Sequence, residues 1–393
     1  MANPLAYLRS QIDQWRADGA YQRLRVLESP CAAESRFDGK EVINLASNNY
    51  LGLTTHPKLI EAALEATRKY GVGSGAVRTI SGTMRLHMQL EERIAAFKHV
   101  EACVVFQSGF AANAGTVSAI LTSEDHIISD ELNHASIIDG CRLSKAAIHV
   151  FPHKDAAAAE KILAELEAKP GRKLLITDGV FSMDGDIAPL PALVEAAGRH
   201  GAIMMIDDAH SSGVLGRNGR GTVDHFGLHG RVDIQVGTLS KAIGALGGYV
   251  CGSRDLIDFL YHRARPFLFS TSHPPSVAAA CLAAFDVLEQ EPERIQALWE
   301  NTRYFKAGLV AEGFSAGMSE TPITPVLVGD AALAHRLSRC LFEEGVLATG
   351  IGFPTVPKGK ARVRTIVAAT HTKAELDRAL EAFRKAGREL GLI

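Results

Sequence analysis

Closely spaced cysteine pairs and long apolar runs are both absent from this sequence of 393 residues. Its six cysteines are scattered and no two follow the C-x-x-C spacing, which argues against a disulfide scaffold or a zinc site. No stretch approaches the roughly 18 apolar residues of a membrane-spanning helix. The N-terminus also lacks the basic start and apolar run of a signal peptide. We therefore expect a cytoplasmic protein without membrane contacts.

Neither sign of charge is in excess. The chain has 42 lysines and arginines against 44 aspartates and glutamates, so nothing in the balance suggests a nucleic-acid partner. The length suggests two or three lobes rather than one minimal core.

Common nucleotide and metal motifs are missing as well. Neither G-x-x-x-x-G-K-[ST] nor H-E-x-x-H occurs, and we expect no metal. The segment "GVGSGA" at 71–76 fits G-x-G-x-x-A, with Glu91 about 20 residues further on. However, the preceding "KLIEAALEATRKYG" has the pattern of an amphipathic helix rather than a strand. The context that a dinucleotide site requires is therefore absent.

The middle of the chain instead contains short apolar runs that alternate with helical patterns. The runs lie at 102–109, 126–129, 148–151, 173–179, 202–208, 233–238 and 248–252. This alternation predicts an α/β fold with a mostly parallel seven-stranded sheet covered by helices.

The flanking segments differ from this pattern. Apolar residues from Leu5 to Trp15 fall at helical spacing, and a long helical stretch over 276–312 is followed by mixed strand and helix patterns. We therefore predict three parts. They are an N-terminal helix and arm over 1–45, a large domain over 46–275 and a small α+β domain over 276–393.

One lysine stands in an otherwise small and apolar segment, "GTLSKAIGALGG" at 237–248. Burial lowers the pKa of a lysine and makes it a better nucleophile toward carbonyl carbons. The alternative is a lysine that pairs with a carboxylate or reaches solvent. Thr238 and Ser240 place two hydroxyls beside Lys241, which suits an aldehyde that carries a phosphate and so predicts pyridoxal phosphate (PLP).

PLP makes further demands, which residues at other expected strand ends meet. Its ring nitrogen needs a carboxylate, which Asp207 or Asp208 supplies, and strand periodicity does not decide between them. A helix pattern that starts at Gly109 offers N–H groups to the phosphate, while His134 suits stacking and His210 the ring hydroxyl. Each residue alone has a structural alternative, such as a helix cap. Their order along one α/β domain favours a PLP site.

Several long motifs resemble those of one known family, the PLP-dependent α-oxoamine synthases. They are "NLASNNYLGL", "SDELNHASIIDG", "TDGVFSMDGDIAPL", "IDDAHSSGVLG", "GTLSKAIGALGG", "RPFLFSTS" and "GIGFPTVPKGKARVRT", and together they span nearly the whole chain. The resemblance implies a type I aminotransferase-like fold and a homodimer with shared active sites.

The resemblance also implies a role for each site residue. Lys241 is implied to form the Schiff base and to act as acid and base at the substrate Cα, and Asp207 rather than Asp208 to face the ring nitrogen. The other implied cofactor contacts are His134 on the ring face, His210 at the ring oxygen with Ser182 nearby, and Gly109, Phe110, Thr238 and Ser240 at the phosphate. Implied elsewhere are Arg364 at the amino acid carboxylate, Asn48 and Thr355 on the substrate side, and Ser270 or Thr271 at the partner subunit's phosphate.

The implied reaction joins an amino acid to an acyl-CoA and releases CoA. Because "AVRTISGT" and "FPTVPKGKARVRT" look closest to glycine C-acetyltransferase, we expect glycine and acetyl-CoA to give 2-amino-3-oxobutanoate. The alternative is 8-amino-7-oxononanoate synthase, which uses alanine and pimeloyl-CoA; other acyl chains also remain open. Rival interpretations are an aminotransferase or C–S lyase on the same fold, and a non-catalytic binding protein.

Overall fold

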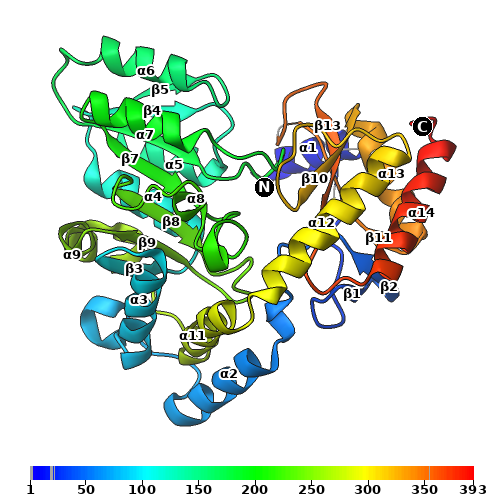
Figure 1. Cartoon of the computed structure of the whole chain (residues 1–393), viewed down its shortest axis with the longest axis horizontal. Coiled ribbons are helices and arrows are strands. Elements are labelled where there is room, and N and C mark those ends of the chain that lie inside the picture. Colours follow the sequence, from blue (N-terminus) through cyan, green and yellow to red (C-terminus); the bar gives the residue numbers. More distant parts are fainter. Residues whose placement is uncertain (1–2, 18–20, 22, 354) are drawn as a thin grey trace.

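The computed structural model describes residues 3–17, 21, 23–353 and 355–393. It has a large lobe around a seven-stranded sheet and a smaller lobe that contains the C-terminal helices (Figure 1). The sheet has the strand order β3-β9-β8-β7-β6-β4-β5. Its strands are β3 (Ala102–Phe106), β4 (His126–Asp130), β5 (Ala147–Phe151), β6 (Lys173–Asp178), β7 (Ile203–Asp207), β8 (Ile234–Thr238) and β9 (Gly248–Gly252). Strand β9 runs antiparallel to both of its neighbours, β3 and β8, and the other strand pairs of this sheet are parallel, so the expected mostly parallel sheet is confirmed.

Both faces of this sheet are buried, which explains why its strands read as continuous apolar runs. Successive residues of a strand point to opposite faces. In β6, Leu174 and Ile176 join the core beneath α4, α5 and α9, whereas Leu175 joins the core beneath α6 and α7. The covering helices are α4 (Gly109–Ile120), α5 (Ala135–Ser144), α6 (Ala156–Glu165), α7 (Leu190–Arg199), α8 (Thr222–His225), α9 (Arg254–Arg263) and α10 (Arg265–Leu268).

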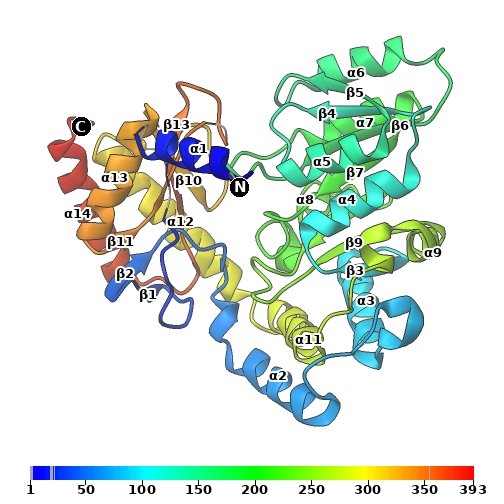
Figure 2. The same cartoon turned by 180° about the vertical axis from the view of Figure 1, so that it is seen from behind.

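A further layer of helices extends the large lobe (Figure 2). It consists of α2 (Pro57–Tyr70), α3 (Arg85–Lys98) and α11 (Pro275–Gln290), of which α11 packs on the other two. Short helical turns are η1 (Leu53–Thr55), η2 (Arg78–Gly82) and η3 (Arg217–Gly219). The glycine-rich segment 71–76 follows helix α2 rather than a strand, so the geometry of a dinucleotide site is absent there.

The small lobe contains two three-stranded sheets. One has the order β10-β13-β12 and consists of β10 (Ile323–Gly329), β12 (Thr349–Ile351) and β13 (Ala361–Ile366). The other joins β1 (Glu34–Phe37) and β2 (Lys40–Asn44) to β11 (Val346–Leu347), with β2 and β11 parallel. Three helices pack around these sheets, namely α12 (Glu293–Ala311), α13 (Ala331–Glu343) and α14 (Lys373–Glu389). The arm strands thus belong to a small-lobe sheet, and the domain divisions at 45 and 275 stay predictions.

Two expected helices differ in detail. The single helical stretch expected over 276–312 is divided between α11 and α12, because Pro292 disfavours a helical conformation at Glu291, whose φ is −125° and ψ 58°. The N-terminal helix α1 (Ala6–Ala17) forms as expected, but none of its residues is buried. Among the described residues, no helix combines the length and the apolar character needed to cross a membrane.

Candidate active site

Polar side chains meet where the parallel strands of the large sheet end. Asp178, Asp207 and Thr238 are the last residues of β6, β7 and β8, and His134 directly precedes α5. The carboxyl ends of neighbouring parallel strands lie at one edge, which is where α/β sheets bind ligands.

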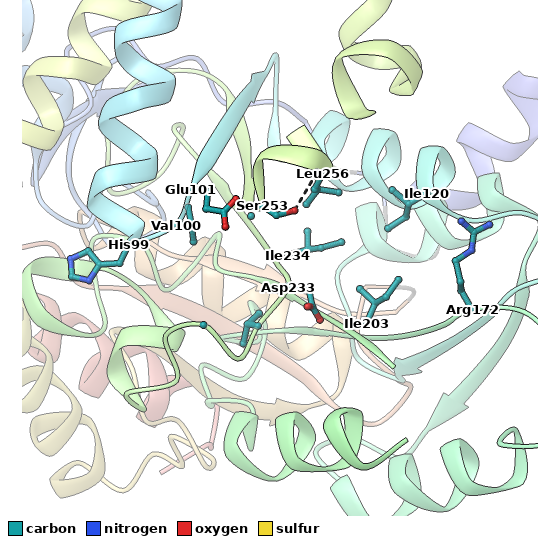
Figure 3. Close-up of a pocket in the computed structure, with 13 residues that line it drawn as sticks. His99, Val100, Glu101, Ile120, Arg172, Ile203, Asp233, Ile234, Ser253 and Leu256 are labelled. Carbon is teal, nitrogen blue, oxygen red and sulfur yellow. Dashed lines mark hydrogen bonds between the residues drawn. The ribbon is translucent and has the colours of Figure 1, made fainter. Parts of the chain in front are cut away.

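A hollow of about 660 Å³ lies at the opposite edge, beside the first residues of β7 and β8 (Figure 3). Its charged groups already have partners within the chain. Asp233 accepts a hydrogen bond from the Met204 amide (2.8 Å), and Arg172 pairs with Asp125 (3.0 Å). We therefore place the candidate site at the carboxyl edge.

Lys241 follows β8 by three residues and faces two carboxylates. Burial lowers its pKa to about 8, although the carboxyl groups of Asp207 and Asp178 act in the opposite direction. Near neutral pH a lysine of this kind carries far more neutral, nucleophilic amine than an exposed lysine does.

Asp207 and Asp208 have different surroundings. The carboxylate of Asp207 accepts hydrogen bonds from the Asn113 side chain (2.6 Å) and from the Ala209 amide (2.8 Å). Asp208 is fully buried and pairs with Lys98 at 2.7 Å. Of these two carboxylates, Asp207 is therefore the one that can interact with a ligand beside Lys241, and its role at the ring nitrogen stays a prediction.

His134 caps helix α5 beside these groups. Its backbone amide donates to the buried carboxylate of Asp178 (2.7 Å), whose pKa burial raises well above the usual range. Burial also lowers the pKa of the imidazole, aided by the charge of Lys241 and opposed by that of Asp207. A neutral ring of this kind suits stacking on an aromatic cofactor.

His210 lies deeper in the site and contacts a tyrosine that the sequence analysis did not assign. Its Nδ1 lies 2.7 Å from the hydroxyl of Tyr50, and the two side chains are 6% and 1% exposed. Burial, together with the positive charges of Lys241 and Arg364, holds the pKa of His210 well below its usual range. The neutral imidazole can therefore share a hydrogen bond with an oxygen on a ligand.

The start of α4 forms an anion site with the end of β8. Ser108 caps the helix by accepting from the Ala111 amide, and a Cβ added to Gly109 would lie 3.4 Å from the Thr238 side chain. The hydroxyls of Thr238 and Ser240 are 2.8 Å apart, and Ser240 and Phe110 are exposed. Free N–H groups at a helix start and adjacent hydroxyls are donors that fit a phosphate.

The substrate-side residues come from segments far apart in the sequence. Arg364 of β13 donates to the Ser182 carbonyl (3.1 Å), and burial lowers its pKa. The side-chain oxygen of Asn48 is buried without a protein partner in the described structure, which suits a polar ligand. Thr355 is exposed, and its amide donates to the Gly352 carbonyl (3.0 Å).

The two residues expected to serve a partner subunit lie beyond the end of β3. Gln107 donates to the carbonyl of the exposed Thr271 (2.7 Å), and Ser270 precedes it in the chain.

The donor set as a whole fits PLP. Lys241, with its lowered pKa, matches the aldehyde, and Asp207, fixed by a hydrogen bond from Asn113, matches the ring nitrogen. The start of α4 and the nearby hydroxyls match the phosphate. The sequence analysis missed Asn113, Ser136 and Asp178 as well as Tyr50. Asn113 follows Gly109 by four residues, a helical spacing that already indicated a shared face of α4.

Comparisons with known proteins identify the family of the chain. Residues 40–383 match the family model for aminotransferase class I and II. An 8-amino-7-oxononanoate synthase of Symbiobacterium thermophilum is 63% identical over 98% of this chain and 99% of its own. The 8-amino-7-oxononanoate synthase 1 of Bacillus subtilis is 55% identical over the whole of both chains.

Solved structures give the same result for the fold. Serine palmitoyltransferase from S. paucimobilis with a bound PLP–myriocin aldimine has a TM-score of 0.95 at 34% identity, over all of both chains. The 8-amino-7-oxononanoate synthase of Francisella tularensis has a TM-score of 0.76 at 29% identity, over 90% of this chain and 99% of its own.

These relatives do not support the expected preference for glycine and acetyl-CoA, because the similar curated enzymes bear the name of the alternative. The sequence motifs could not distinguish these two pairs of substrates, for a physical reason. Alanine differs from glycine by one methyl group, and acyl-chain length depends on the shape of a channel. The choice between them does not affect the reaction type that both share, the joining of an amino acid to an acyl-CoA. The chain belongs to the class I and II aminotransferase family, as a PLP-dependent α-oxoamine synthase.

Proposed function

We propose that this enzyme is an 8-amino-7-oxononanoate synthase. It would join alanine to pimeloyl-CoA, with release of CoA and of the alanine carboxyl group as carbon dioxide. The observation that carries the proposal is the 63% identity to an enzyme of that name over nearly the full length of both chains.

The site residues have distinct roles in this proposal. PLP, when bound, supplies an electron sink for the substrate Cα. Asp207 holds the ring nitrogen, His134 covers one ring face, and His210 binds the ring oxygen with Ser182 nearby. The phosphate is held by Gly109, Phe110, Thr238 and Ser240. Lys241 anchors the cofactor and moves the proton at Cα, which its lowered pKa favours.

Arg364 is proposed to bind the carboxylate of alanine, with Asn48 and Thr355 on the same side. A guanidinium offers two parallel N–H groups, which match the two oxygens of a carboxylate. The Ser182 carbonyl orients Arg364 through a 3.1 Å hydrogen bond. This contact fixes the direction of the side chain without neutralising its charge.

A homodimer with shared sites is also proposed. The chain exposes 17637 Å², whereas a monomer of 42.1 kDa is expected to expose about 15,000 Å². Large apolar side chains such as Val72, Ile80 and Phe269 are more than two-thirds exposed. A second copy would cover such surface, and Ser270 or Thr271 would then reach the partner subunit's phosphate. The cytoplasmic location stays a prediction.

A substrate screen tests the proposed function directly. CoA thiol release should be fastest with alanine and pimeloyl-CoA, and replacing alanine by glycine should lower kcat/KM by about 10- to 200-fold, the discrimination expected for one methyl group. Labelled carbon dioxide should appear from carboxyl-labelled alanine. Acyl-CoAs of graded length serve as controls. Faster thiol release from glycine and acetyl-CoA would contradict the assignment.

Arg364→Ala should raise the KM for alanine by about 10- to 150-fold, the usual loss for a hydrogen bond to a charged group. The KM for pimeloyl-CoA should change little, because the thioester does not meet this guanidinium. Steady-state kinetics with each substrate varied in turn give both values. Arg364→Lys is the matched control, which keeps the charge but loses the fork. An equal rise in both KM values would argue against a carboxylate role.

A further inference from the structure

We propose that Asn113 and Ser136 form a hydrogen-bonded bridge that positions Asp207 and His134 around the coenzyme ring. The inference rests on the proposed placement of the ring nitrogen at Asp207. It adds two positioning residues to the site, Asn113 on α4 and Ser136 on α5.

The bridge is continuous and buried. The Asn113 side chain is 0% exposed, and its amide nitrogen lies 2.6 Å from Asp207 Oδ2 and 2.9 Å from Ser136 Oγ. Ser136 Oγ in turn lies 2.7 Å from His134 Nδ1. Three hydrogen bonds therefore connect the carboxylate to the imidazole through two side chains.

The orientation of the Asn113 amide follows from its partners. An ionised carboxylate only accepts hydrogen bonds, so the NH₂ group and not the carbonyl oxygen must face Asp207. The carbonyl oxygen of Asn113 is buried without a partner in the described residues. An arrangement that leaves one polar atom unpaired is retained only where the opposite orientation costs more, as two oxygens in contact beside Asp207 would.

The contacts of Ser136 also indicate the tautomer of His134. The Ser136 backbone N–H lies 3.2 Å from His134 Nδ1, and a backbone N–H can only donate. Nδ1 is therefore an acceptor, and the Ser136 hydroxyl can donate to the same atom. The proton of the neutral ring must then lie on Nε2. Asn113 thus directs one N–H toward the anion and the other toward the hydroxyl that orients the imidazole.

The functional consequence concerns the proton between Asp207 and the ring nitrogen. A donated hydrogen bond stabilises the anionic carboxylate and so favours the proton on the ring. Without Asn113 the carboxylate becomes a stronger base and takes a larger share of that proton. A purely structural asparagine that only ties α4 to α5 would leave this distribution unchanged.

The test uses the holoenzyme loaded with PLP labelled with ¹⁵N in its ring. In Asn113→Leu, a change of similar volume, the ratio of ring-protonated to carboxyl-protonated forms should fall by about 10- to 150-fold. The ¹⁵N resonance should accordingly move toward the value of the unprotonated ring. Thr116→Val, on the same helix and also fully buried, is the matched control and should leave the resonance unchanged.

The outcomes separate the bridge from the proposed site. A protonated ring in the unmodified enzyme with an unchanged resonance in Asn113→Leu would overturn the bridge and leave the site standing. An unprotonated ring in the unmodified enzyme would overturn the placement at Asp207, and the bridge with it. If Asn113→Leu does not fold, Ser136→Ala provides the second test. It removes the hydroxyl between Asn113 and His134, so the ¹⁵N resonance of His134 Nδ1 in labelled histidine should move toward that of a more weakly hydrogen-bonded acceptor, while the ring proton stays on Nε2 because the Ser136 backbone N–H remains. An unchanged Nδ1 resonance would overturn the bridge.

Discussion

Lys241→Ala should lower CoA release in the complete reaction by about 10²- to 10⁴-fold, the contribution of a positioned acid–base group. The remaining groups for the cofactor are intact in this variant, since Asp207 and the start of α4 do not depend on the lysine. PLP should therefore still bind, but with no covalent anchor and no group to move the proton at Cα. The variant thus tests chemistry rather than folding.

The lowered pKa gives this prediction a pH dependence. Burial favours the neutral amine, so the reactive form of Lys241 should increase as pH rises through about 8, whereas an exposed lysine would need a pH near 10.5. PLP uptake by the apoprotein, followed by visible absorbance, should show that midpoint.

Lys98 is an internal control for the covalent label. It is also buried, but its amine is bound to Asp208 at 2.7 Å and to the Arg220 carbonyl at 2.5 Å. Borohydride treatment of the loaded enzyme should therefore place the label on Lys241 and leave Lys98 unmodified, as peptide mass spectrometry would establish. A label on Lys98 would refute the assignment of the anchor.

The strands were predictable because burial on both faces makes each one a short apolar run bounded by polar residues. The sequence pattern could not decide which of Asp207 and Asp208 faces the ring nitrogen, because strand periodicity shows only that they face opposite sides of the sheet. The structure distinguishes them through Lys98, which reaches Asp208 from the end of α3, 110 residues earlier. A contact of that separation leaves no local pattern in the sequence.

Other features were hidden for the same reason. Strand β2 pairs in parallel with β11, about 300 residues later, so the arm could not be assigned to the small-lobe sheet from its own pattern. Tyr50 belongs to the segment "NLASNNYLGL", yet only the fold brings its hydroxyl to His210. Charged residues at strand ends can be recognised from the sequence pattern. The neutral residues that orient them can be recognised only from tertiary contacts.

Asp207→Asn should reduce kcat by about 10²- to 10³-fold, because a preorganised charge is removed from the group it stabilises. The side-chain shape is unchanged, and the oxygen of the new amide can still accept from Asn113. PLP should therefore bind with its ring unprotonated, and turnover should fail for want of an electron sink. Rates measured at saturating substrate, together with the ring ¹⁵N resonance, would establish both effects.

Asp208→Asn is the matched control, because it makes the same chemical change one residue further along. Loss of the Asp208 charge would leave Lys98 buried without a counter-ion, which lowers the free energy of unfolding by roughly 3–5 kcal/mol. We therefore expect Asp208→Asn to lower Tm while the PLP ring in the folded fraction stays protonated. We expect Asp207→Asn to keep Tm while the ring loses its proton. If the two variants instead lost turnover equally at equal stability, the different roles assigned to Asp207 and Asp208 would be wrong. The proposed site for the ring nitrogen would then be wrong as well.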